Sequence, residues 1–288
     1  MKIKIGNVEL QNQVILASGT VGFGLELNAM GVLDNIGAIS LKTITLEPRE
    51  GNPQPRIWKT PSGILNSIGL ENPGVDVFLE SALPLVKKFP TKLIANIGGK
   101  SIEEYVTLTQ KIGDKVDLIE VNLSCPNAKG AGLAFGTNPD VVGELVSRVK
   151  AAAKVPIIVK LTSNVTDPAA IAKAAENSGA DAISAINTVL AMDFDLKTGK
   201  PVFANKVAGL SGAAILPIAL RVVWQMAKSV KIPIIGMGGI TCADDARKFF
   251  MAGAKAVSIG TQNFVNPWIG AEIAEELEKD ITKNQLRF

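Results

Sequence analysis

Cys125 and Lys160 are the two side chains whose type and position best suit chemistry at neutral pH. The chain contains no histidine, so the commonest general base of enzymes is missing. Cys125 lies in the sequence Asn122-Leu123-Ser124-Cys125-Pro126-Asn127, directly after the apolar run of residues 117–121. Lys160 follows the apolar residues 157–159, where an uncompensated ammonium group would be costly. We therefore expect proton transfer near neutral pH to depend on Cys125 or on a lysine in an unusual environment.

Eight short apolar runs alternate with helical segments along the chain. The runs are continuous and rich in β-branched residues, as is typical of strands covered on both faces. Ser101 and Glu104 form a capping box, and Asp167-Pro168 begins another helix that Gly179 ends. This alternation predicts an α/β fold, a (β/α)8 TIM barrel in which residues 1–288 form a single domain. The predicted strands are residues 14–17, 38–41, 93–97, 118–121, 157–161, 182–186, 234–236 and 256–259.

Three further segments complete the predicted barrel. Residues 2–10, which turn at Gly6-Asn7, are expected to form an N-terminal β-hairpin over its lower end. Residues 43–73 and 188–211 are long inserts after the second and sixth strands, at the C-terminal face where barrel enzymes keep their chemistry. Residues 128–136 contain three glycines, which suit either a moving lid over Cys125 or fixed tight turns.

Composition excludes several classes of function. The formal net charge of +3 is small and dispersed, which argues against a nucleic-acid partner. Two cysteines, Cys125 and Cys242, argue against a disulfide scaffold and fit a cytoplasmic protein. We identify no signal peptide, no membrane-spanning apolar stretch, no metal-binding cluster and no dinucleotide-binding glycine motif. We therefore expect a protein without metal that acts on a small molecule.

The carboxyl ends of the predicted strands carry most of the polar side chains that could do chemistry. Because these ends converge at one face of a barrel, we expect their residues to share a site. The glycine turns after the last two strands match the position at which barrels bind phosphate through backbone N–H groups. The set therefore predicts a phosphate-bearing cofactor beneath a small polar substrate. Its members are Ser18, Gly19, Thr20, Lys42, Thr43, Asn96, Asn122, Cys125, Lys160, Asn187, Thr188, Gly238, Gly239, Gly260 and Thr261.

A series of motifs resembles the dihydroorotate dehydrogenase family over nearly the whole chain. Each motif is modest alone, but their order and spacing together are specific. Ser163, Ala208 and Ala213 depart from the residues usual in the family, and none of them removes a reactive group. Besides residues 122–127, the motifs are Ala17-Ser18-Gly19-Thr20, Leu65-Asn66-Ser67-Ile68-Gly69-Leu70, Ala134-Phe135-Gly136-Thr137, Val159-Lys160-Leu161, Ile186-Asn187-Thr188, Gly209-Leu210-Ser211-Gly212 and Ile235-Gly236-Met237-Gly238-Gly239-Ile240.

The resemblance implies an FMN-containing barrel that oxidises dihydroorotate to orotate in pyrimidine biosynthesis, with Cys125 as the base. The segment after Cys125 most resembles the NAD-linked subfamily (class IB). That likeness implies an iron–sulfur flavoprotein partner that carries FAD and a 2Fe–2S cluster, and a homodimer within a heterotetramer. Two cysteines are too few for the four ligands of such a cluster, so the sequence is consistent with a cluster on the partner.

The same resemblance implies which residues bind the cofactor and the substrate. Lys160 is expected at the polar edge of the flavin, and residues 67–70 are expected to offer backbone donors to the substrate carboxylate. The implied FMN residues are Ser18, Lys42, Thr43, Asn96, Asn122, Lys160, Ile186, Gly212, Gly238, Gly239, Gly260 and Thr261. The implied substrate residues are Lys42, Asn66, Ser67, Ile68, Gly69, Leu70, Asn122, Asn127, Asn187 and Thr188.

Alternatives remain open for both the residues and the function. Cys125 could be a buried structural thiol, Lys160 a lysine that reaches solvent from a strand end, and each asparagine or glycine a turn former. Cys242 is expected to be inert. Rival functions are a fumarate-dependent homodimeric dihydroorotate dehydrogenase, a flavoprotein acting on uracil-like rings, a Schiff-base aldolase using Lys160, and a binding barrel without catalysis.

Overall fold

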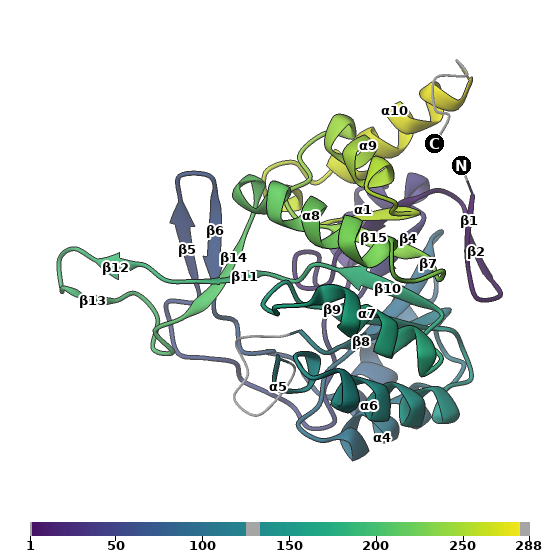
Figure 1. Ribbon diagram of the computed structural model, residues 1–288, viewed down its shortest axis with the longest axis horizontal. Coiled ribbons are helices and arrows are strands. Elements are labelled where there is room, and N and C mark those ends of the chain that lie inside the picture. The colour runs from purple at the N-terminus through teal and green to yellow at the C-terminus, as the bar shows by residue number, and fades with distance from the viewer. Residues whose placement is uncertain (1, 125–132, 283–288) are drawn as a thin grey trace.

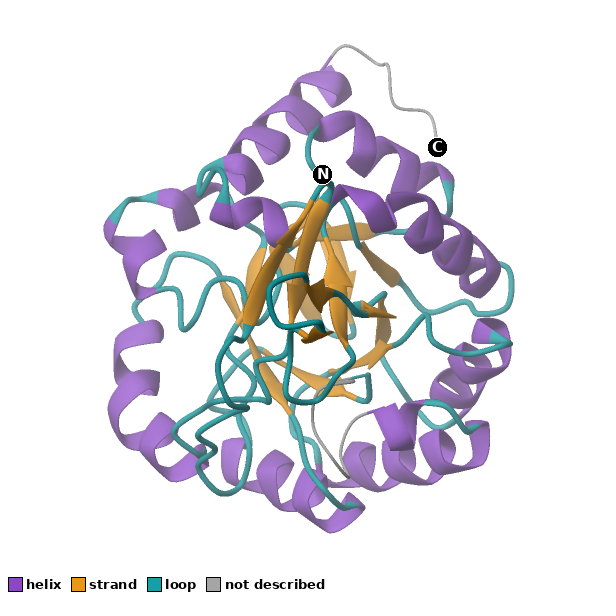
Figure 2. Cartoon of the chain, turned by 90° about the vertical axis from the view of Figure 1, so that its left-hand side faces the viewer, coloured by secondary structure: helices purple, strands orange, loops and turns teal. Residues whose placement is uncertain are grey.

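A closed barrel of eight parallel strands forms the centre of the molecule (Figures 1 and 2). The computed structural model describes residues 2–124 and 133–282. All eight predicted strands are present, and they follow one another around the barrel in chain order. The predicted (β/α)8 architecture is therefore confirmed. The strands are β3 (Val14–Leu16), β4 (Ala38–Ser40), β7 (Lys92–Ile97), β8 (Leu118–Asn122), β9 (Ile157–Leu161), β10 (Ala182–Ala185), β15 (Ile234–Met237) and β16 (Ala256–Ile259).

Helices surround the barrel as an outer ring, as Figure 2 shows. The Ser101 hydroxyl accepts a hydrogen bond from the Glu104 N–H, and the Asp167 carboxylate accepts from Ala169 and Ala170, so both predicted helix starts are confirmed. Within residues 2–124 and 133–282, no helix is long and apolar enough to span a bilayer. The helices are α1 (Leu25–Ala29), α2 (Val75–Val77), α3 (Leu83–Val86), α4 (Ile102–Ile112), α5 (Leu133–Gly136), α6 (Pro139–Ala152), α7 (Pro168–Asn177), α8 (Leu216–Ala227), α9 (Ala243–Met251) and α10 (Ile269–Thr282). Short turns of other helix types are η1 (Val32–Asn35), η2 (Phe78–Ala82), η3 (Ala213–Ile215) and η4 (Thr261–Phe264).

The predicted N-terminal hairpin closes the lower end of the barrel. It consists of β1 (Ile3–Ile5) and β2 (Val8–Leu10), which pair in antiparallel fashion. The side chains of Ile5 and Leu10 are fully buried and join an apolar cluster that includes Leu118 and Ile158 from inside the barrel. The lower layer of the barrel interior is therefore apolar and sealed from solvent.

The middle of the barrel interior is polar. Successive side chains of a strand point to opposite faces, so a residue two positions above an inward apolar residue also points inward. On β8 the inward residues are Leu118, Glu120 and Asn122, because Ile119 and Val121 pack against the helices. None of the polar residues at the middle level is more than 5% exposed: Ser40, Asn96, Glu120, Lys160, Ser184 and Ser258.

The two long inserts join to form a sheet of four strands. The strand order is β11-β14-β6-β5, and β6 pairs with β14 through Gly209 and Asn66 in antiparallel register. Figure 1 shows this sheet, with a small hairpin of β12 and β13, projecting from the barrel on the side opposite the N-terminal hairpin. The sequence predicted both inserts at the C-terminal face but not their pairing. The strands are β5 (Ile57–Thr60), β6 (Gly63–Asn66), β11 (Val189–Ala191), β12 (Phe194–Asp195), β13 (Lys200–Pro201) and β14 (Ala208–Ser211).

Candidate active site

A cavity of about 200 Å³ lies at the carboxyl ends of the barrel strands. It is bounded by strand ends, by the sheet of the two inserts and by the turns after β15 and β16. The structure thus brings together residues from segments that are far apart in the sequence. The predicted residues that line it are Ser18, Gly19, Thr20, Lys42, Thr43, Asn66, Ile68, Gly69, Leu70, Asn122, Lys160, Ile186, Asn187, Thr188, Gly212, Gly238, Gly239, Gly260 and Thr261.

Two predicted site residues lie behind the cavity wall instead of in it. Asn96 is fully buried and donates a hydrogen bond to the Glu120 carboxylate. Ser67 is 1% exposed, and its N–H donates to the Arg56 carbonyl at 2.8 Å while its hydroxyl accepts from Asn52 at 3.0 Å. Both residues therefore support the wall, and the Ser67 N–H is already engaged within the chain.

Cys125 and Asn127 lie outside the described residues, as does most of the glycine-rich segment 128–136. Gly136 is described, and a Cβ atom at this position would overlap the Leu123 carbonyl oxygen. Close packing against Leu123 thus requires glycine at position 136, which is a different reason from the lid and the tight turns considered for this segment.

The backbone that leads into position 125 is fixed by a hydrogen-bond network. The Asn122 side-chain oxygen accepts from both the N–H and the hydroxyl of Ser124, at 3.2 and 3.0 Å. Asn187 donates to the Ser124 hydroxyl at 2.9 Å, and the buried Tyr105 hydroxyl donates to the Asn122 carbonyl at 2.8 Å. Side chains from β8, α4 and the end of β10 therefore hold the last described residue before Cys125.

Glu120 is the residue of this region that the sequence analysis missed. The residue is 3% exposed, and its carboxylate lies 4.0 Å from the Lys160 ammonium. Glu120 stands inside an apolar run, so composition and motif gave no reason to select it. The available signal was the alternation on β8, which places Glu120 on the same face as Asn122.

Glycine turns form the side of the cavity that faces α8 and the end of β16. Gly212, Gly238 and Gly239 have φ angles of 102°, 125° and 79°, in the region that favours glycine. Short helical turns begin directly after Gly212 and Gly260, and their first N–H groups have no partner within the turn; among them, that of Ala214 donates to the Ser62 carbonyl at 3.0 Å. This arrangement of donors suits an anionic group such as a phosphate.

Asp245 braces the loop that follows these glycines. Its carboxylate accepts hydrogen bonds from the N–H and the hydroxyl of Thr241, which lines the cavity, at 3.0 and 2.8 Å. Burial acts to raise the pKa of Asp245, but hydrogen bonds from Thr241 and Lys248 outweigh it and hold the pKa below its usual value. The loop is therefore tied to the start of α9 by a charged group.

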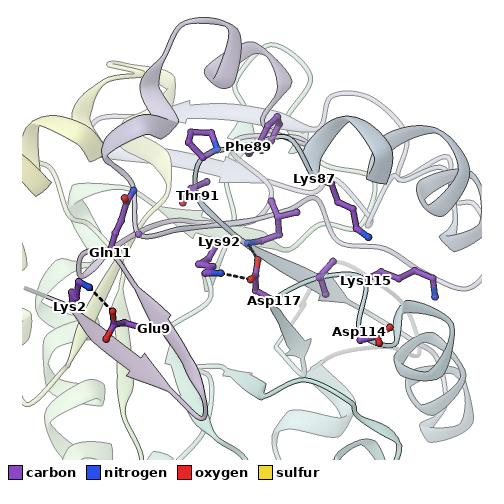
Figure 3. A pocket seen from close by; sticks show the side chains of 14 residues that line it. Lys2, Glu9, Gln11, Lys87, Phe89, Thr91, Lys92, Asp114, Lys115 and Asp117 are labelled. Atoms are coloured by element: carbon purple, nitrogen blue, oxygen red, sulfur yellow. Dashed lines mark hydrogen bonds and ion pairs between the residues drawn. The ribbon is translucent and has the colours of Figure 1, made fainter.

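A second cavity, of about 580 Å³, lies at the opposite end of the barrel (Figure 3). Several charged residues line it, and four of them pair with one another: Lys2 contacts Glu9 at 2.7 Å, and Lys92 contacts Asp117 at 2.8 Å. It lies at the amino ends of the strands, away from the face where barrel enzymes carry their chemistry. Among the described residues, no group of three or more His, Cys, Asp or Glu side chains is arranged to hold a metal ion.

Comparison with known proteins assigns the chain to a family. Residues 1–281 match the family model described as dihydroorotate dehydrogenase. A relative from Caldicellulosiruptor bescii is 54% identical over 278 residues, which are 96% of this chain and 93% of the relative. One from Desulforamulus reducens is 51% identical over 286 residues, which are 99% of this chain and 94% of the relative. Both are named "Dihydroorotate dehydrogenase B (NAD(+)), catalytic subunit".

A solved structure supports the fold. The crystal structure of DHODH from Eimeria tenella in complex with ferulenol superposes with a TM-score of 0.84. It is 24% identical in sequence, and the match covers 98% of this chain and 85% of that chain.

Proposed function

Because the chain belongs to the dihydroorotate dehydrogenase family, we propose that it oxidises dihydroorotate to orotate in pyrimidine biosynthesis. We propose further that it is the catalytic subunit of an NAD-linked enzyme, as its relatives are named. The observation that carries this proposal is the cavity at the strand ends, where two lysines, three asparagines and the glycine turns converge. Such a site suits a small polar ring above a phosphate-bearing cofactor.

The cofactor in this proposal is one FMN per chain, and residues 1–288 form one FMN-binding domain. When bound, FMN supplies the acceptor for the hydride that leaves the substrate. The chain's own part is to hold the phosphate at Gly212, Gly238, Gly239, Gly260 and Thr261, which line one side of the cavity. Lys160 places a positive charge at the floor of the cavity.

Dihydroorotate presents two carbonyls, two ring N–H groups and a carboxylate. The side chains of Asn66, Asn122 and Asn187 each offer both a donor and an acceptor to such a ring. Lys42 carries the charge that would face the substrate carboxylate, with residues 68–70 beside it in the cavity wall. These contacts orient the ring so that one carbon faces the base and the next faces the hydride acceptor.

The base in this proposal is Cys125, which lies outside the described residues. It takes a proton from a ring carbon, and a thiolate suits this step near neutral pH in a chain without histidine. The network of Asn122, Ser124 and Asn187 holds the backbone directly before it.

Electrons leave this chain through a second subunit in our proposal. That partner is an iron–sulfur flavoprotein with FAD and a 2Fe–2S cluster, and the complex is a homodimer of this chain with one partner on each copy. The name "catalytic subunit" of the relatives supports a partner. We place the enzyme in the cytoplasm, because two cysteines and no disulfide framework suit a reducing compartment.

Reduction of the purified, FMN-loaded chain by dihydroorotate tests the proposal. We expect the flavin absorption to bleach without a partner, and Cys125→Ser to slow bleaching by about 10²–10⁴-fold, the usual contribution of a general base. Cys242→Ser is the matched control, because this exposed thiol at the start of α9 should leave the rate unchanged. A chain that stays colourless with FMN, or a Cys125→Ser variant that bleaches at the wild-type rate, would contradict the proposal.

Turnover assays of the same chain identify the electron acceptor. With dihydroorotate we expect reduction of artificial dyes but no NADH formation in the absence of the partner. Rapid turnover with fumarate would instead place the enzyme among the fumarate-dependent homodimers.

A further inference from the structure

The Glu120 carboxylate lies at the centre of the polar layer inside the barrel. One of its oxygens accepts hydrogen bonds from Ser40, at 2.9 Å, and from Asn96. The other accepts from Ser184 at 2.7 Å. These donors belong to β4, β7 and β10, so the carboxylate is fixed from several sides of the barrel. These three donors are neutral, so they satisfy the carboxylate oxygens but do not compensate the negative charge.

Lys160 supplies the compensating charge. Its side chain is 6% exposed, and its ammonium nitrogen lies 4.0 Å from the Glu120 carboxylate. At this separation the two groups attract by charge, but the distance is too long for a hydrogen bond. Glu120 therefore holds the ammonium in place without occupying one of its three N–H donors, while Lys160 still lines the cavity.

We propose that Glu120 is a positioning residue, which fixes the Lys160 ammonium at the cavity floor and offsets its charge, and so limits how strongly the site favours reduced over oxidised FMN. This inference rests on the proposed function only for its flavin part. Reduced FMN carries more negative charge than oxidised FMN, so an uncompensated Lys160 would bind it more tightly. A carboxylate beneath the ammonium weakens that preference and helps electrons to leave.

A purely structural role for Glu120 predicts a different pattern of variants. If only hydrogen bonding mattered, loss of any one donor would act like loss of the charge. If the charge matters, Glu120→Gln, which keeps the length of the side chain and one acceptor oxygen but removes the charge, should have an effect that Ser184→Ala does not share. Glu120→Asp keeps the charge but shortens the side chain, so it tests the loss of hydrogen-bond geometry without a loss of charge.

Unfolding of the FMN-free chain in urea tests the pairing independently of the flavin. The four proteins of the cycle are wild type, Glu120→Gln, Lys160→Met and the double variant. Each single variant leaves a buried charge unpaired, so we expect it to raise the equilibrium constant of unfolding. In the double variant we expect the increase in this constant to be at least about tenfold smaller than the product of the two single increases. Single effects that multiply without coupling would overturn the pairing. If Glu120→Gln alone does not fold, a folded double variant supports the pairing and an unfolded one overturns it.

The ratio of FMN dissociation constants in the oxidised and reduced states tests the effect on the flavin. For Glu120→Gln we expect reduced FMN to gain about tenfold over oxidised FMN, which for a two-electron couple is a positive shift of about 30 mV in midpoint potential. Ser184→Ala and Glu120→Asp should change this ratio by less than about threefold, which is clearly smaller than the tenfold change expected for Glu120→Gln. An unchanged or lower potential in Glu120→Gln, or an equal shift in Ser184→Ala, would overturn the inference. A chain that binds no FMN would refute the proposed function, while the urea cycle would still decide the pairing.

Discussion

Replacement of Gly239 by alanine should damage the predicted phosphate turn in two measurable ways. Gly239 has a φ angle of 79°, and a Cβ atom there would lie 2.7 Å from the backbone nitrogen and 2.8 Å from the Cα of Leu216. The left-handed conformation costs an L-residue about 1–2 kcal/mol. Overpacking against a neighbour that cannot turn aside costs about 1–3 kcal/mol more. We therefore expect Gly239→Ala to lower the free energy of unfolding by about 2–5 kcal/mol.

The affinity of Gly239→Ala for FMN should also fall. Leu216 follows η3 directly, so a shift of Leu216 moves the turn at Gly212. Urea unfolding of the FMN-free chain measures the first effect, and quenching of FMN fluorescence measures the second. Gly22→Ala is the matched control for strain: its φ is 56° and a Cβ there meets no atom within 4 Å, so it should cost only about 1–2 kcal/mol.

Gly260→Ala completes the comparison, because it separates binding from stability. A Cβ at Gly260 would make ordinary contacts, the nearest with Ala17 at 3.8 Å, so stability should change little. FMN affinity should nevertheless fall, since Gly260 lines the cavity where the phosphate is proposed to bind. The reasoning is refuted if Gly239→Ala destabilises the chain no more than Gly22→Ala does.

Two further predictions concern the framework behind the site. Tyr105→Phe removes the hydrogen bond to the Asn122 carbonyl, and we expect a loss of about 0.5–1.5 kcal/mol in urea unfolding; a wild-type value would contradict the role of this bond. The lowered pKa of Asp245 means that its contribution to stability is present above its unfolded pKa, about 4, and is lost as pH falls through the lower folded pKa. Asp245→Asn should therefore lower stability at neutral pH and flatten the acid limb of the unfolding free energy; an acid limb like that of the wild type would argue against this ionisation.

Much of the fold could be predicted because parallel barrel strands are buried on both faces. Such strands appear as continuous apolar runs, and all eight runs became barrel strands with bounds within about a residue or two, the usual uncertainty of element ends. Once the strands were known, barrel topology alone predicted which residues share one end. Lys42, Lys160 and the glycine turns accordingly meet in one cavity.

What could not be predicted depends on contacts between distant segments. The sheet of the two inserts requires β6 and β14 to pair across about 140 residues of sequence, with Asn66 opposite Gly209. Neither strand is longer than four residues, too short for a clear alternation of apolar and polar positions. Glu120 was missed for a related reason, because its hydrogen-bond donors come from three other strands and are invisible in its own neighbourhood.

Strand β8 shows why the folding of the barrel and the assembly of the site are the same event. Leu118 belongs to the apolar layer sealed by the hairpin, Glu120 to the polar layer, and Asn122 to the cavity wall. Because side chains alternate with a period of two, a shift of one residue would turn all three toward the helices and bring Ile119 and Val121 inside. Such a shift would bury the Glu120 charge among helix-facing apolar residues and leave Lys160 uncompensated. The buried charge pair therefore penalises the wrong register, so the polar layer helps to specify the barrel that carries it.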